Sequence, residues 1–233
     1  QKNKLEKILN KKNKNLILFD GFYSLDKLNN KKIKVKNNLN KKNQNYFIDL
    51  NLTENIFLDL INFQTNSKKN SNIKAEYKVK NKKFIFKSID FTEDKNIISV
   101  KGLVLNSKNE IEKISSIKIL TFYKNKENNN FVINFGKKIS IIGKKYDSSN
   151  LLKLLSEPSK SNPLKNFSTE IEIQIKNLIN KPKIPLSNFN LIGLIEKGKF
   201  NKISAKSQFS DDKYLDISLK KNKNNKKILE VYS

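Results

Sequence analysis

The side chains of this sequence that could carry out chemistry are carboxylates and lysines. Asp90, Glu93 and Asp94 form one acidic cluster, and Asp211 and Asp212 form an adjacent pair. Adjacent residues of a strand point to opposite faces, so the pair at 211 and 212 is unsuited to acid–base catalysis and is typical of a turn. The cluster at 90–94 lacks the spacing and the glycine of a calcium loop. Neither group predicts a catalytic or a metal site.

Several residue types are missing altogether. The 233 residues contain no His, Cys, Met or Trp, and all 48 basic residues are Lys because Arg is absent too. The chain therefore has no zinc site of the usual ligands, no Cys nucleophile, no disulfide and no Ser-His-Asp triad. Without Arg it also lacks the side chain with which DNA-binding proteins most often read guanine. We expect no enzyme and no bound cofactor.

The formal net charge is +26, from 48 Lys against 22 acidic residues. Lys, Asn and Ile make up nearly half of the chain and share A/T-rich codons, so base composition accounts for much of this excess. Dense Lys on the solvent side of strands also protects sheet edges from aggregation. The alternatives are binding to anionic lipid or to nucleic acid. Because Phe and Tyr share strand faces with Ile, we expect no nucleic-acid site.

Apolar residues recur with a period of two, which is typical of strands with one apolar and one polar face. Ile171, Ile173 and Ile175, for example, alternate with charged and amide side chains. The same alternation occurs in residues 73–79, 84–86, 97–105, 111–122, 131–135, 203–209 and 215–219. The sequence therefore predicts an all-β fold with antiparallel pairing.

The connectors between these segments are short and polar. They include residues 106–109, 126–130 and 210–213, as expected for a meander of hairpins. Glycine is scarce, and Asn, which tolerates the left-handed conformation, replaces it at many turns. The Lys/Asn-rich stretches 1–14 and 36–44 are expected to be mobile.

Two segments depart from the strand pattern and predict short helices. Leu151, Leu152, Leu154 and Leu155 have helical spacing within residues 148–155, with Asp147 as N-cap and Pro158 as stop. A second short helix is expected around Glu54–Leu60. The expected organisation is a flexible start at 1–14, strands over 15–155 ending in the helix at 148–155, a linker at 156–167, and further hairpins over 168–233.

The stretch that follows Ile142, Gly-Lys-Lys-Tyr-Asp-Ser-Ser-Asn-Leu-Leu, resembles an element of bacterial AsmA-like proteins, the YhdP-like branch of the AsmA/TamB superfamily. That element has the pattern Gly-x-x-aromatic-Asp-x-x-x-Leu-Leu, and the matching residues are Gly143, Tyr146, Asp147, Leu151 and Leu152. The order of the surrounding hairpins extends the resemblance over roughly residues 72–233.

The resemblance implies a bridge-like lipid carrier of the Gram-negative envelope. Such proteins have an elongated, twisted antiparallel β-sheet that is curled into an open groove with an apolar lining. An N-terminal helix anchors them in the inner membrane, and they span the periplasm towards the outer membrane. This chain, which has no Met and no anchor, would be an internal fragment that contacts the acyl chains of phospholipids. The candidate groove-lining residues are Ile171, Ile173, Ile175, Leu191, Ile203, Leu215 and Ile217.

Other functions are compatible with the same pattern. Two apolar sheet faces could close on each other in a β-sandwich, which would be a structural or adhesive domain of a surface or secreted protein. The helix at 148–155 could plug or cover a groove, or simply pack on the sheet to close a core. A nucleic-acid-binding module is the third alternative.

Overall fold

The computed structural model describes residues 6–8, 16–23, 31–40, 43–52, 55–66, 70–150, 168–180, 185–197, 199–210, 213–222 and 226–233. The chain divides into two compact units. The first comprises Gln1–Ile56 and Thr65–Ile117, and the second comprises Phe57–Gln64 and Lys118–Ser233. The described residues are almost entirely strand, which confirms the all-β prediction. No helix in this part of the chain is long and apolar enough to cross a membrane.

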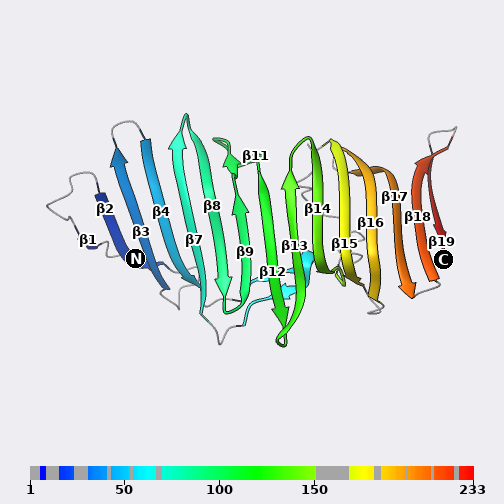
Figure 1. The fold of residues 1–233 in the computed structure, drawn as a ribbon. Helices are drawn as coiled ribbons and strands as arrows, with labels where there is room; N and C mark the ends of the chain where they lie inside the picture. The colour runs from blue at the N-terminus through cyan, green and yellow to red at the C-terminus, as the bar shows by residue number, and fades with distance from the viewer. Residues whose placement is uncertain are drawn as a thin grey trace. The chain divides into compact units, whose positions relative to one another are not determined.

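The strands of the first unit form repeating antiparallel hairpins (Figure 1). They are β1 (Glu6–Ile8), β2 (Leu16–Tyr23), β3 (Lys31–Asn40), β4 (Asn43–Leu52), β7 (Ser71–Lys80), β8 (Lys83–Glu93), β9 (Asn96–Lys101), β10 (Val104–Leu105) and β11 (Ile111–Lys113). Each strand from β1 to β4 pairs with the next, and β4 pairs with β7, β7 with β8 and β8 with β9. β10 lies against both β8 and β11.

The second unit holds the longer strands. Its elements are β5 (Phe57–Leu58), the 3-10 turn η1 (Asp59–Ile61), β6 (Phe63–Gln64), most of β12 (Ser116–Tyr123), β13 (Lys126–Phe135), β14 (Lys138–Asp147), β15 (Thr169–Ile179), β16 (Pro185–Glu196), β17 (Lys199–Ser210), β18 (Lys213–Lys221) and β19 (Lys227–Tyr232). β13 to β19 pair in chain order and lie side by side in Figure 1.

One pair of strands departs from the antiparallel prediction. β14 and β15 are parallel, with Ile139 beside Ile171 and Asp147 beside Ile179. Parallel neighbours cannot be joined by a tight turn, because the chain has to return along the full length of the strands. The long segment between Asp147 and Thr169 makes this crossover possible, whereas every other pairing from β13 to β19 is antiparallel.

Asn and Lys take the place of glycine at the turns, as predicted. Asn81 and Lys82, between β7 and β8, have φ values of 52° and 59°. Lys124 and Asn125, between β12 and β13, have φ values of 48° and 61°. Positive φ at both central residues is the requirement of the type I′ turn that matches the twist of hairpin strands. Asn and Lys residues therefore adopt the positive φ values that these hairpin turns require.

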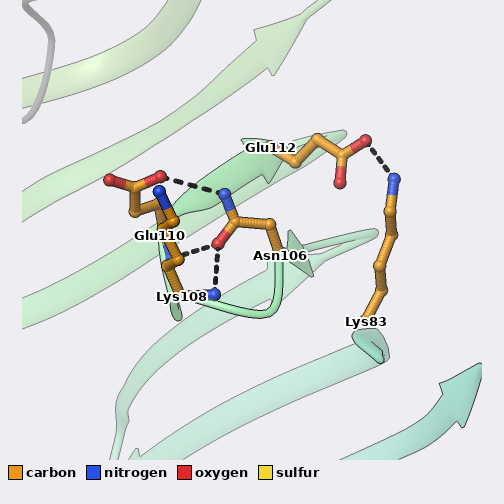
Figure 2. Close-up of polar contacts among 5 residues, drawn as sticks. All are labelled: Lys83, Asn106, Lys108, Glu110 and Glu112. Atoms are coloured by element: carbon orange, nitrogen blue, oxygen red, sulfur yellow. Dashed lines mark hydrogen bonds and ion pairs between the residues drawn. The ribbon is translucent and has the colours of Figure 1, made fainter. Parts of the chain in front are cut away.

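The loop between β10 and β11 shows how an Asn side chain organises a turn (Figure 2). Asn106 Oδ1 accepts hydrogen bonds from the backbone N–H groups of Lys108, at 2.9 Å, and Glu110, at 3.0 Å. Its amide donates to Glu110 Oε2 at 3.0 Å. Beside the loop, Lys83 Nζ of β8 lies 2.5 Å from Glu112 Oε1 of β11. The predicted connector at 106–109 is thus confirmed as a turn held by its own first residue.

Several local predictions need correction. Residues 126–130 were predicted as a connector, but they form the first half of β13, because the turn before this strand lies at Lys124 and Asn125. Most of the stretch 36–44 lies in β3 and β4. The second predicted helix is reduced to the single 3-10 turn η1, which ends at Asn62 in the left-handed conformation (φ 46°). Of the predicted helix at 148–155, residues 151–155 lie outside the described residues, as do the linker at 156–167 and the start at 1–5 and 9–14.

The core of the second unit lies on one face of its sheet. Ile139, Ile171 and Ile195 form a buried cluster there. Ile133, Phe135, Ile141, Ile173, Leu191 and Phe200 pack against it. In the first unit, Tyr77 stacks on Tyr46 with ring centroids 4.8 Å apart and also contacts Phe86 at 5.0 Å. These aromatic residues therefore pack with one another or with Ile, whereas Phe57, Tyr123, Tyr214 and Tyr232 are exposed.

Candidate functional site

The apolar residues of the second unit line up in rows across the strands β14 to β19. Cross-strand partners of a sheet share a face, so the register defines these rows. One row consists of Ile141, Ile173, Leu191, Ala205, Ile217 and Val231. The next consists of Ile139, Ile171, Gly193, Ile203, Leu219 and Leu229. We call the surface formed by these two rows, together with Ile175, Phe189 and Leu215, the apolar face.

All seven predicted groove-lining residues lie on the apolar face. Ile175 is beside Phe189, and Leu215 is opposite Ser207, two residues beyond Ala205. Burial differs among the seven, since Ile175 is only 1% exposed and Ile171 is buried as well. Ile173, Leu191, Ile203, Leu215 and Ile217 are half-buried and keep part of their surface accessible.

The opposite face of the same strands is polar. Lys138 of β14 forms an ion pair with Glu172 of β15, and Lys220 Nζ lies 2.8 Å from Glu230 Oε2. The hydrogen bond from Lys138 lowers the pKa of the Glu172 carboxyl and raises the pKa of Lys138 itself. These pairs are in contact with solvent, so they contribute little to stability. This face also carries exposed apolar side chains, which are Ile142 (49% exposed), Ile192 (68%), Ile228 (37%) and Tyr232 (65%).

A buried polar network lies where β13 meets the η1 turn. We call its buried members Thr121, Asn128, Asn129 and Asp147, together with the exposed Asn62, the Asn clasp. The Asn129 amide, which is 0% exposed, donates to the Ile61 carbonyl at 2.7 Å and to Thr121 Oγ1 at 2.8 Å, and its Oδ1 accepts from the Asp147 N–H at 2.9 Å. Thr121 in turn donates to Asn128 Oδ1 at 2.9 Å. Every hydrogen-bonding group of the Asn129 side chain is thus satisfied.

The clasp continues from Asn129 through Asp147 to Asn62. Asp147 Oδ2 accepts from Asn62 Nδ2 at 2.9 Å, and Asp147 Oδ1 accepts from the Ser149 N–H at 3.1 Å. Ser148 Oγ donates to the Ile179 carbonyl at 2.8 Å. Since Asn62 and Asp147 are far apart in the sequence, the clasp holds residues 57–64 against the strands of the second unit.

Three of the residues on which the predicted resemblance depends, Gly143, Tyr146 and Asp147, contribute to this region. A Cβ at Gly143 would lie 2.3 Å from Phe131 Cβ, so only glycine fits against β13 there. Phe131 also packs edge-on against Tyr146, with ring centroids 5.1 Å apart. The Tyr146 hydroxyl donates to the Leu60 carbonyl at 2.9 Å, and burial, with a smaller effect of the Asp147 charge, raises the pKa of Tyr146 to about 12. The other two motif residues, Leu151 and Leu152, lie outside the described residues.

The acidic cluster at 90–94 serves the structure of the first unit. Glu93 is buried, and its carboxylate accepts from the Asn66 N–H at 2.8 Å, Ser71 Oγ at 3.0 Å and Asn96 Nδ2 at 3.1 Å. Asp90 accepts from Ser99 on the neighbouring strand. Among the described residues no acidic cluster could hold a metal ion. Asp211 and Asp212 lie outside them.

Sequence reasoning missed the Asn clasp because Asn128 and Asn129 were assigned to a polar connector at 126–130, and because Asp147 was interpreted only as a helix cap. A signal for Asn129 was nevertheless present, since it continues the two-residue spacing of Phe131, Ile133 and Phe135 towards the start of β13. That spacing directs Asn129 to the same side as these apolar residues, where a polar side chain requires buried partners.

Comparison with known proteins finds no family model, no curated protein and no solved structure that matches this chain. The resemblance to AsmA-like proteins therefore remains a prediction that is based on the motif and on the order of the hairpins.

Proposed function

We propose that the apolar face of the second unit binds the acyl chains of phospholipids. On this proposal the chain is the periplasmic part of an inner-membrane-anchored, AsmA-like protein. That protein carries phospholipids between the inner and outer membranes and contributes to outer-membrane biogenesis. Binding is passive and no residue performs chemistry.

The observation that carries the proposal is the continuity of the rows from β14 to β19. Adjacent strands are ~4.8 Å apart, so five spacings give an apolar strip about 24 Å wide. Each methylene group of an acyl chain that leaves water for such a surface gains ~0.8 kcal/mol. The half-buried side chains Ile173, Leu191, Ile203 and Ile217 have accessible apolar surface for this contact. The polar opposite face supports a one-sided lipid site.

Photocrosslinking from the two faces tests the proposal. A photoreactive amino acid at Ile173 or Ile203 is expected to label phospholipid in cells and in vesicles. Glu172 and Lys202 are the matched positions on the opposite face, next to each of them in the chain. A photoreactive amino acid at Ile192, an exposed apolar position on the opposite face, shows how much lipid is labelled by an exposed apolar residue outside the apolar face. Equal labelling from both faces would contradict the proposal, and crosslinks from Ile173 to polypeptide without lipid would favour the β-sandwich of a structural or adhesive domain.

A pair of neighbouring substitutions provides a binding test. Leu191 and Ile192 are consecutive residues of β16 and lie on opposite faces. We expect Leu191→Glu to lower the binding of a fluorescent phospholipid at least tenfold, because it places a charge in the middle of a row. Ile192→Glu introduces the same charge on the other face and should leave binding unchanged. A similar loss of phospholipid binding in both variants would show that the added negative charge weakens binding wherever it lies, and would contradict a site on the apolar face.

A further inference from the structure

A polar pocket of about 290 Å³ lies on the sheet of the first unit. Its lining residues are Lys34, Asp49, Asn51, Asn72, Lys74 and Thr92. Lys34, Asp49 and Lys74 are cross-strand partners in one row. Asn51, Asn72 and Thr92 are partners in the next row. The pocket is thus built by β3, β4, β7 and β8, and each of these strands is paired with a neighbour on both sides.

Asn72 holds the hydrogen-bond acceptors of the pocket in place. Its amide nitrogen donates to Asp49 Oδ1 at 2.5 Å and to Asn51 Oδ1 at 3.0 Å, so both of its hydrogens are used. Among the described residues, no donor contacts the other carboxylate oxygen of Asp49, Oδ2. The pocket therefore presents an acceptor whose position is fixed before a ligand arrives, which lowers the entropy cost of binding.

Hydrogen-bond donors lie beside these acceptors. Lys34 and Lys74 belong to the two strands that flank Asp49, and neither forms an ion pair within the described part of the chain. Thr92 adds a hydroxyl group, and all three side chains are exposed. Covering the pocket with another polypeptide segment would remove two ammonium groups and a carboxylate from water, which is costly. The charges therefore favour a pocket that faces solvent.

An exposed aromatic ring adjoins the pocket on the same face of the sheet. Phe47 precedes Asp49 by two residues in β4, so the two side chains share a face and their Cα atoms are ~6.7 Å apart. The Phe47 side chain is 39% exposed in a polar setting, since its cross-strand partner is Glu76. Glu76 itself forms an ion pair with Lys87 at 3.0 Å. The ring thus offers a flat apolar surface at the border of the pocket.

The mixture of charges and polar groups selects the class of ligand. An anion is attracted by the two lysines but repelled by Asp49, which lies between them in the row, and a cation is attracted and repelled in the opposite sense. Uncharged hydroxyl groups avoid both penalties, because each of them can donate to a carboxylate and accept from an ammonium group. The volume is close to the lower end of small-molecule pockets, ~300 Å³, so the ligand is small.

We propose that this pocket binds a neutral saccharide of one or two pyranose rings. Its hydroxyl groups donate to Asp49 and accept from Lys74 and Thr92, and the C–H face of a ring packs on Phe47. The proposal is independent of lipid binding, because the pocket belongs to the first unit and the apolar face to the second.

Saturation-transfer NMR on the intact chain tests the proposal. The probes are the methyl pyranosides of glucose, galactose, mannose and N-acetylglucosamine. We expect transfer to at least one of them, strongest at the ring protons that face Phe47. Its affinity in calorimetry should change less than twofold between low salt and about 0.5 M NaCl, because the ligand is uncharged. Two results would overturn the proposal, which are no transfer to any of the four probes and binding of inorganic phosphate in their place.

Matched substitutions locate the binding site. Asn51→Ala and Lys74→Ala should each lower the affinity for the bound pyranoside at least tenfold. Their controls are Asn45→Ala and Lys78→Ala, which change exposed residues of the same type, strand and face outside the pocket lining and should bind like the parent. Phe47→Leu should weaken binding whereas Phe47→Tyr, which keeps the flat ring, should retain it. Equal thermal melting shows that the variants are folded, and equal affinity of pocket and control variants would overturn the proposal.

Discussion

Replacing Asn129 with Ala removes the centre of the Asn clasp and should destabilise the second unit. The substitution deletes two donated hydrogen bonds and one accepted hydrogen bond. Thr121 still donates to Asn128, but the Ile61 carbonyl and the Asp147 N–H lose their partner. Each buried, unpaired group costs ~1–3 kcal/mol, so the free energy of unfolding should fall by about 4 kcal/mol.

The assay is hydrogen exchange in increasing urea, read at amides of the second unit. The Asp147 N–H is the most direct probe, because Asn129 is its acceptor. Its protection factor should fall by at least tenfold in the Asn129→Ala variant. Asn134→Ala is the matched control, because Asn134 is an exposed Asn of the same strand. Surface changes of that kind usually alter stability by less than ~0.5 kcal/mol.

Two results would refute this reasoning. One is an Asn129→Ala variant that is as stable as Asn134→Ala. The other is a double variant, Asn129→Ala/Thr121→Val, whose loss in free energy of unfolding equals the sum of the losses in the two single variants. The two side chains share a hydrogen bond of 2.8 Å, so the effects of the two substitutions should instead couple by ~0.5–3 kcal/mol.

Three further predictions concern Gly143, Tyr146 and Glu93. Gly143→Ala should lower the melting temperature markedly, because the added Cβ would lie 2.3 Å from Phe131 Cβ. Gly136→Ala, whose added Cβ would have its nearest contact at 3.8 Å, should melt like the parent. Equal melting temperatures of the two variants would contradict the packing argument. Tyr146 should titrate near pH 12, as seen in phenolate absorbance. Because the folded protein keeps this proton above pH 10 and the unfolded chain loses it, stability should fall between pH 10 and about 12, and an unchanged pH profile in Tyr146→Phe would refute the assignment. Glu93→Gln places an amide N–H₂ group among three hydrogen-bond donors, so the free energy of unfolding of the first unit should fall by ~1–3 kcal/mol. An unchanged midpoint of urea unfolding would contradict the structural role of the Glu93 carboxylate.

The face on which the apolar residues lie could be predicted because strand periodicity is a local property. Ile171, Ile173 and Ile175 share a face in any strand that contains them. The turns were predictable for a similar reason, since Asn tolerates the positive φ that Asn81 and Asn125 adopt. Neither inference requires knowledge of distant partners.

The features that the sequence did not reveal depend on distant contacts. The spacing of β13 could place Asn129 on the buried side, but its partner, the carbonyl of Ile61, lies 68 residues earlier in the chain, and no local pattern contains that pairing. The parallel alignment of β14 with β15 depends on how the chain between Asp147 and Thr169 returns. Asp147 was predicted as a helix cap, and its Oδ1 does accept from the Ser149 N–H. Its bond to Asn62 was beyond local inference, because the two residues are 85 positions apart.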